Sequence, residues 1–255
     1  MASTQIKAVA LYENAGIDAT AVFSGTEVSG REKENAVDWQ EYTVFEVEAG
    51  TTTLTWTLDS AQPIDAVAIY HASMGAGIGA TVEVEVNAGG WATIDTVVLD
   101  GSGHVRFLQF DTIGGATEIR WTFTVSGGSL LVRQLMAGLQ LEMYKGQWSG
   151  ISPGTLLSGI VKTNMISSSG ALIGANVRRT VRQMEITLDM LSESWVRNEW
   201  AAFAEHMQGK PCVFSWNPTE WPREAVWAAA TEIKAPSNSS IAPSMQVSMP
   251  LVVRG

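Results

Sequence analysis

Alternation at a period of two residues is the feature that most constrains how this chain folds. Residues 81–86 alternate strictly between a valine and a threonine or glutamate. Because successive side chains of a β-strand point to opposite faces, this pattern predicts a strand with one buried and one wet face. Residues 51–58, 105–110 and 118–125 follow the same rule, and residues 66–70 form a wholly apolar run of the buried type.

Glycine-containing turns separate these runs. They fall at residues 87–90, 100–103 and 114–115, where glycine and asparagine tolerate the positive φ angles of tight turns. Several short strands with regular turn signals predict a β-sandwich of the jelly-roll type. The fold class is therefore predicted to be mainly β.

One amphipathic helix is predicted over residues 193–208. The Ser192 hydroxyl can accept from the free amides of the first turn, and Gly209 can end the helix. Four apolar residues spaced at i, i+4, i+7 and i+11 form a stripe along it: Val196, Trp200, Phe203 and Met207. We expect Trp200, Phe203 and Met207 to lie in a structural core, packed on a sheet.

Charge divides the chain into two parts. Residues 1–145 hold 18 acidic and 7 basic side chains, whereas residues 146–255 hold 8 acidic and 9 basic ones. With a Gly- and Ser-containing stretch at 146–174, this predicts two domains, 1–145 and 146–255. The acidic first part argues against nucleic-acid binding. No apolar run is long enough for a membrane span, and no secretory signal is expected.

No catalytic residue, metal site or cofactor is predicted. The three histidines share no ligand spacing, and the lone Cys212 is expected to be a buried hydrophobe. The Gly-x-Ser-x-Gly spacing of many hydrolases occurs at residues 150–154, within the Gly- and Ser-containing stretch that is predicted to connect the two domains. Paired carboxylates that hydrolyse glycosidic bonds remain an open alternative, because acidic residues are plentiful over 13–65.

Aromatic side chains near predicted loops are the candidate ligand-binding groups. Trp39, Tyr70 and His71 are predicted to line ligand-binding loops, and Tyr42 and Trp91 lie in similar positions. Such rings can stack on sugars. The alternative is that each ring caps an end of the sandwich.

Three arginines begin a predicted strand in the only part of the chain that is not acidic. Arg178, Arg179 and Arg182 are predicted to lie at an interface between subunits, because arginine is enriched at interfaces. The alternative is that they are merely solvated.

The first part of the chain resembles the discoidin, or coagulation-factor 5/8 type C, jelly roll. Residues 53–71 place a threonine-rich strand, a short turn and a buried strand in succession, and residues 119–123 fit a later strand. In that family, loops at one end of the sandwich bind carbohydrate or lipid headgroups, sometimes with a structural calcium. The resemblance implies an outward-facing N-terminal β-sandwich.

The last third resembles the C-terminal domain of tail-tip and baseplate proteins of long-tailed bacteriophages. Residues 195–200, 205–206 and 211–218, with Phe203, carry most of the match. This resemblance implies a tail-tube-like β-sandwich with one packed α-helix, which assembles as a ring. The order of the two domains departs from that of the best-known distal tail proteins, whose accessory domain usually follows the ring domain.

Together the two resemblances imply a non-enzymatic structural protein of a phage tail tip or baseplate. Its partners would be copies of itself in a ring, with a hexamer favoured over a trimer, and the tail-tube, tape-measure and tail-hub proteins. It would be made in the bacterial host cytoplasm and reside in the virion. The alternative is a carbohydrate-binding module that attaches the virion to a host-surface glycan, and a weaker one is a hydrolase of surface glycans.

Overall fold

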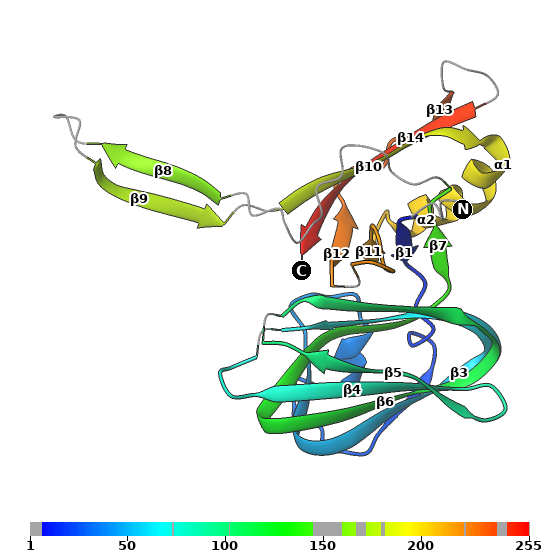
Figure 1. Cartoon of the computed structure of the whole chain (residues 1–255), viewed down its shortest axis with the longest axis vertical. Coiled ribbons are helices and arrows are strands. Elements are labelled where there is room, and N and C mark those ends of the chain that lie inside the picture. Colours follow the sequence, from blue (N-terminus) through cyan, green and yellow to red (C-terminus); the bar gives the residue numbers. More distant parts are fainter. Residues whose placement is uncertain are drawn as a thin grey trace.

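The computed structural model describes residues 7–144 apart from 73 and 102, residues 160–166 and 172–179, and residues 182–254 apart from 222 and 239–243. Of 160–166, 172–179 and 182, only the backbone is described. The described chain is mainly strand, with one short helical segment, which confirms the predicted fold class (Figure 1). It forms a β-sandwich, a seven-stranded sheet and a projecting hairpin.

The sandwich is built from five strands and a short 3-10 helix, η1 (Lys33–Ala36). Hydrogen bonding connects the strands in the order β2-β3-β6-β4-β5. Their bounds are β2 (Thr20–Phe23), β3 (Phe45–His71), β4 (Gly79–Asn87), β5 (Trp91–Leu99) and β6 (Val105–Gly138).

β3 and β6 are long bent ribbons that serve both layers of the sandwich. Residues 51–57 of β3 lie opposite residues 124 down to 118 of β6, so this pairing runs antiparallel. Residues 66–70 lie between two further stretches of β6, 105–109 and 134–138. Residues 51–57 of β3 and 118–124 of β6, together with β2, β4 and β5, form what we call the outer layer. Residues 66–70 of β3 and the two stretches of β6 beside them form the inner layer.

Alternation places the core between these two layers. Val82, Val84 and Val86 of β4 are completely buried, whereas the residues between them are partly exposed. Trp56 and Trp121 meet edge to face in this core, with ring centroids 5.3 Å apart. The strand faces predicted from the period-two pattern are thus present.

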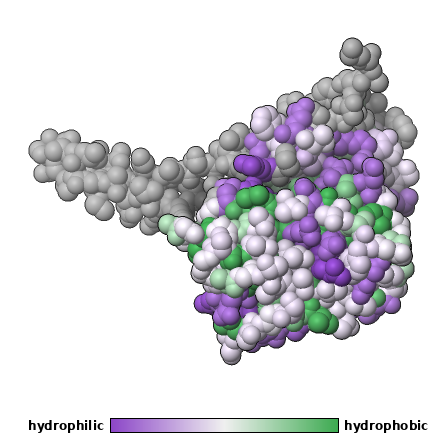
Figure 2. Space-filling model, turned by 60° about the horizontal axis from the view of Figure 1, so that its bottom comes forward, coloured by the Kyte–Doolittle hydropathy of each residue, from purple (hydrophilic) through white to green (hydrophobic). Residues whose placement is uncertain are grey.

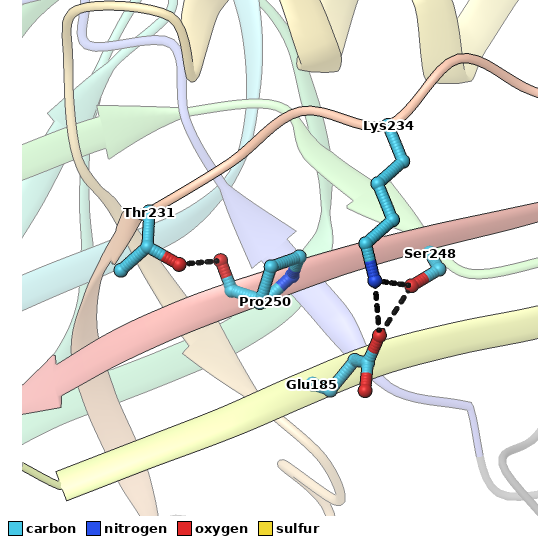
Figure 3. A network of polar contacts seen from close by, with 5 residues as sticks. All are labelled: Glu185, Thr231, Lys234, Ser248 and Pro250. Atoms are coloured by element: carbon cyan, nitrogen blue, oxygen red, sulfur yellow. Dashed lines mark hydrogen bonds and ion pairs between the residues drawn. The ribbon is translucent and has the colours of Figure 1, made fainter.

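The seven-stranded sheet has the order β10-β14-β12-β11-β1-β7, with β13 paired to β14. The bounds are β1 (Val9–Leu11), β7 (Gln140–Glu142), β10 (Arg182–Ser192), β11 (Cys212–Ser215), β12 (Ala225–Ala230), β13 (Ser237–Asn238) and β14 (Ser244–Arg254). A segment after β12 lies along β14, where Lys234 Nζ contacts Glu185 Oε1 at 3.0 Å and Ser248 Oγ at 3.4 Å (Figure 3). Thr231 Oγ1 also donates to the Pro250 carbonyl oxygen.

A helical segment covers one face of this sheet. It consists of α1 (Glu193–Trp195), the π-helical turn η2 (Val196–Trp200) and α2 (Ala201–His206). The Ser192 hydroxyl accepts from the Trp195 amide at 3.3 Å, as a capping residue does. Trp200, Phe203 and Met207 are 1%, 0% and 3% exposed and belong to the core between helix and sheet.

The strand pairing does not follow the predicted boundary at residue 145. β1 and β7 lie within residues 1–145, yet β1 pairs with β11 and with β7 in the seven-stranded sheet. The sandwich, residues 15–138, is therefore inserted between two neighbouring strands of that sheet, and we call it the inserted sandwich. Three-residue strands carry no periodic signal that names a distant partner, so the sequence alone could not assign β1 and β7 to this sheet. Whether 1–145 and 146–255 fold as independent domains remains a prediction.

A third hydrophobic cluster joins the inserted sandwich to the seven-stranded sheet, and we call it the junction. Ala66, Ala68 and Phe107 come from the inner layer, and Val213 and Trp227 come from the sheet. All five are less than 5% exposed. The inner layer is thus covered on both faces, and the outer layer lies on the far side of the sandwich.

The strands β8 (Ile160–Ile166) and β9 (Leu172–Arg179) form an antiparallel hairpin of their own. Figure 1 shows this hairpin, which we call the arm, projecting from the body beside the start of β10. Within the described residues, its two strands form a separate two-stranded sheet.

Candidate functional site

Tyr70, one of the predicted ligand-binding residues, lies in the junction. Its ring packs against Trp227, with centroids 5.8 Å apart, and it is 5% exposed. Its hydroxyl donates to Glu41 Oε1 at 2.8 Å. Burial, followed by the Glu41 carboxylate, raises the pKa of the Tyr70 phenol, so it stays neutral.

Trp39 lies in the loop before β3 but also packs into the junction. Its ring stacks on Trp227 at 6.1 Å and meets His206 edge to face at 5.1 Å. Its backbone φ is 63°, in the left-handed region that bulky residues rarely adopt. Its indole nitrogen is buried without a hydrogen-bond partner. Packing in the junction therefore holds Trp39 in a strained conformation.

His71 ends β3 at the edge of the sandwich core and is completely buried. Its Nδ1 donates to the Ala72 carbonyl oxygen at 2.8 Å, and its Nε2 has no partner. Arg106, which is ion-paired to Asp100, lies nearby. Burial and then the Arg106 charge lower the pKa of His71, which keeps the imidazole neutral.

These placements leave no face of Tyr70 or His71 open to a ligand. Both belong to a strand that is buried on its two faces, one by the sandwich core and the other by the seven-stranded sheet. The uninterrupted apolar run at 66–70 is typical of such strands. The sequence therefore held a signal for burial here, and a ligand-binding role for Trp39, Tyr70 and His71 stays a prediction.

An exposed aromatic group lies instead on the outer layer. Trp91, at the start of β5, is 37% exposed. The Arg120 guanidinium carbon lies 3.8 Å from the centre of the indole ring. Arg120 Nη1 also donates to Glu85 Oε2 at 3.2 Å, so the cation is fixed between the carboxylate and the ring.

Trp91 begins a row of outward-facing residues that crosses five strands, which we call the Trp91 row. In the strand register each residue lies opposite the next: Trp91, Asn87, Glu118, Thr57 and Thr20. Asn87 Nδ2 donates to Glu118 Oε2 at 2.8 Å. All five side chains are exposed or half-buried.

Figure 2 views the inserted sandwich from the side turned away from the seven-stranded sheet. White and purple residues predominate there, with separate green areas, so the visible face is mostly of intermediate hydropathy or hydrophilic. Of the row, only Trp91 stands out in the sequence, as an aromatic residue near a predicted loop. The signal for the others is the outward position in each alternating strand, but which strands are neighbours is set by tertiary pairing.

The three arginines predicted at an interface fall in or beside the arm. Arg178 and Arg179 lie in β9, opposite Val161 and Ile160, and Arg182 lies in β10, opposite Val253. Their side chains fall outside the described part of the structure. The interface remains a prediction.

The remaining reactive groups offer little chemistry. Cys212 is buried, and burial raises the pKa of its thiol far above the usual range, which disfavours the reactive thiolate form. Among the described residues, no three His, Cys, Asp or Glu side chains gather to hold a metal ion. Within the same residues, no helix is long and apolar enough to cross a membrane.

Comparison with known proteins gives likenesses of structure alone. No protein-family model and no curated protein matches the chain. Among solved structures, the family 32 carbohydrate-binding module of Clostridium perfringens NanJ, solved with galactose, is 20% identical with a TM-score of 0.43, covering 52% of this chain and 99% of that one.

Two further structures give similar values. A Clostridium perfringens carbohydrate-binding module solved with GalNAc-β-1,3-galactose is 22% identical, with a TM-score of 0.42, covering 51% of this chain and 99% of that one. Chitosan-binding module 1 from a Paenibacillus sp. IK-5 chitosanase/glucanase is 20% identical, with a TM-score of 0.41, covering 49% and 98%. Each likeness extends over about half of this chain.

Proposed function

We propose that this is a non-enzymatic protein whose inserted sandwich binds a glycan on the surface to which the protein attaches. The observation that carries the proposal is Trp91, an exposed indole fixed by Arg120 on the outer layer. The described part of the chain leaves that layer's outward face uncovered, whereas the inner layer is buried in the junction.

The chemistry of the outward face suits a sugar. An aromatic ring offers an apolar surface for the C–H face of a pyranose, and neighbouring polar groups fix its hydroxyls. Asn87 and Glu118 supply such groups beside Trp91, already hydrogen-bonded to each other. Among the described residues, the cysteine is buried and no three His, Cys, Asp or Glu side chains gather, and we propose binding without turnover.

A glycan screen of the full chain tests this function. We expect at least one glycan to bind and to raise the melting temperature in a concentration-dependent way, because a ligand that binds only the folded state stabilises it. The bound glycan should be recovered uncleaved. A screen in which no glycan raises the melting temperature would contradict the proposal, and so would cleavage of the bound glycan.

A second candidate function is structural, as a ring-forming subunit of a phage tail tip. The arm is the observation that favours it. A single two-stranded hairpin is at best marginally stable in water, and β8 and β9 form a separate sheet that projects from the body. A neighbouring subunit would supply the missing contacts, and Arg178 and Arg179 lie on this arm.

Ring closure follows when one head-to-tail contact repeats by a fixed rotation. The ring would be a hexamer or a trimer, would contact tail-tube, tape-measure and tail-hub proteins, and would lie in the virion with the inserted sandwich outside. Electron microscopy of particles that contain the chain tests this. A closed ring around the tail axis is expected, and separate monomers on a fibre would contradict it.

A further inference from the structure

We infer that the glycan lies along the Trp91 row, across the strands of the outer layer, and that it is an uncharged oligosaccharide. This inference rests on the proposed glycan-binding function. It places the ligand on the face of the sandwich and away from the loops at its end.

The length of the row sets the size of the ligand. Trp91 lies on β5 and Thr20 on β2, with β4, β6 and β3 between them. Neighbouring strands are about 4.8 Å apart, so the row spans roughly 19 Å. A single sugar would contact only the Trp91 end, whereas a chain of several sugars can contact every residue of the row.

A second row supports the first. Residues opposite one another in the next register position are Thr93, Glu85, Arg120, Thr55 and Val22. Arg120 covers one face of the Trp91 ring and is itself held by Glu85. The indole orientation is therefore set before a ligand arrives, which lowers the entropy lost on binding. The ring face not covered by Arg120 is the one that would stack on a sugar.

Charge selects the ligand class. The inserted sandwich holds 16 acidic and 5 basic side chains over residues 15–138. An anionic polysaccharide would be repelled by this field. Within the two rows, Glu85 is already paired with Arg120, and Glu118 already accepts from Asn87. These groups offer fixed donors and acceptors to the hydroxyls of a neutral sugar.

The end of the sandwich at which β3 finishes is a less suitable place for the ligand. His71 is completely buried there, and Tyr70 is held by Glu41 and Trp227. A ligand at this end would have to displace packed side chains. The Trp91 row needs no such movement.

The experiment is calorimetric titration of the full chain with neutral linear oligosaccharides of increasing length: β-1,4-linked and β-1,3-linked glucose and galactose series. We expect affinity to rise with length and then level off. Trp91→Ala should weaken binding about tenfold or more, the equivalent of losing roughly 1.4 kcal/mol of ring contact. Trp221→Ala removes another exposed tryptophan, 51% exposed, from the β11–β12 connection and should change affinity less than about twofold.

A matched pair of steric variants tests the row independently, in case Trp91→Ala fails to fold. Thr57→Arg blocks the row, whereas Thr51→Arg adds the same side chain at an exposed position of the same strand outside it. We expect binding to be lost only in Thr57→Arg, with both variants melting as the unchanged chain does.

The outcomes separate the site from the function. If a neutral glycan binds but Thr57→Arg and Trp91→Ala retain that binding, the row is the wrong site and glycan binding stands. His104 is a neighbour of His71 at the end of the sandwich; if His104→Ala abolishes binding instead, the ligand lies there. If anionic polysaccharides bind more tightly than neutral ones, the ligand class is wrong. If no glycan binds, both the inference and the proposed function fail.

Discussion

The carboxylate of Glu41 bridges the two parts of the protein by pairing with Arg254 at 3.0 Å. Glu41 lies in the loop before β3, and Arg254 ends β14 of the seven-stranded sheet. The same carboxylate accepts from the Tyr70 hydroxyl, and the Glu41 carbonyl oxygen accepts from Arg133. These polar contacts lie beside the buried junction cluster, so the inserted sandwich is held in one orientation on the sheet. A surface on the sandwich is thereby presented at a fixed angle.

The helix packing makes a first prediction. Phe203→Ala should lower the free energy of unfolding by about 3–5 kcal/mol, the usual cost of deleting a buried aromatic ring. Phe203 is 0% exposed and meets Trp200 and Tyr12 edge to face. Urea unfolding followed by fluorescence measures the effect. Tyr42→Ala, at a position 82% exposed, is the control and should leave stability nearly unchanged; equal losses in both variants would refute the packing.

The two ends of the insertion make a second prediction. A Cβ atom on Gly138 would lie 2.8 Å from the Glu13 carbonyl oxygen, because the chain leaves the sandwich next to where it arrives. Gly138→Ala should therefore destabilise the protein by about 1–3 kcal/mol, as overpacking does. Gly209→Ala is the matched control, since a Cβ there meets nothing within 4 Å. Differential scanning calorimetry of the two variants decides, and equal melting temperatures would count against this close approach.

One buried and one half-buried imidazole, His71 and His206, make a third prediction, on pH. Burial is the main cause that lowers the pKa of His71 and of His206 below 6.5. In the window between each lowered pKa and 6.5, the unfolded chain binds a proton that the folded chain does not, so stability falls as pH falls through this window. Urea midpoints should therefore drop between pH 7.5 and pH 5.5.

A variant of His71 tests whether its imidazole causes part of this loss of stability at lower pH. His71→Gln should show a smaller drop over the same range, because glutamine takes up no proton. Asp100, Arg106 and His104 are the charged or titratable neighbours of His71 and stay in place in this variant. An unchanged slope in His71→Gln would mean that other groups cause the effect.

The topology makes a fourth prediction, on proteolysis. A cut within residues 146–159 should yield two fragments that stay together in native gel filtration. β1 and β7 belong to the N-terminal fragment, and β1 is hydrogen-bonded to β11 of the C-terminal one, with the junction adding buried contacts. The fragments should separate in denaturing gels. Release of a free, stable N-terminal fragment under native conditions would instead indicate two independent domains divided near residue 145.

Local patterns predicted the elements that depend on neighbours in the chain. The alternation of valine and polar residues at 81–86 indicated which side chains of β4 are buried, because the period of a strand is fixed by backbone geometry. Ser192 and the stripe through Trp200 and Phe203 indicated the helix, because the period of a helix is likewise fixed by backbone geometry. The π turn at Val196–Trp200 was not predicted, and propensity carries no signal for it.

The sequence by itself determined the mainly β class, the helix with its buried stripe and the acidic character of the first part of the chain. Only the tertiary structure decided that β1 and β7 leave the sandwich, that Tyr70 and His71 are buried, and that Trp91, Asn87 and Glu118 form one row. The physical reason is that periodicity reports which face of a strand is wet, whereas the partner of that strand is chosen by contacts between residues far apart in the chain.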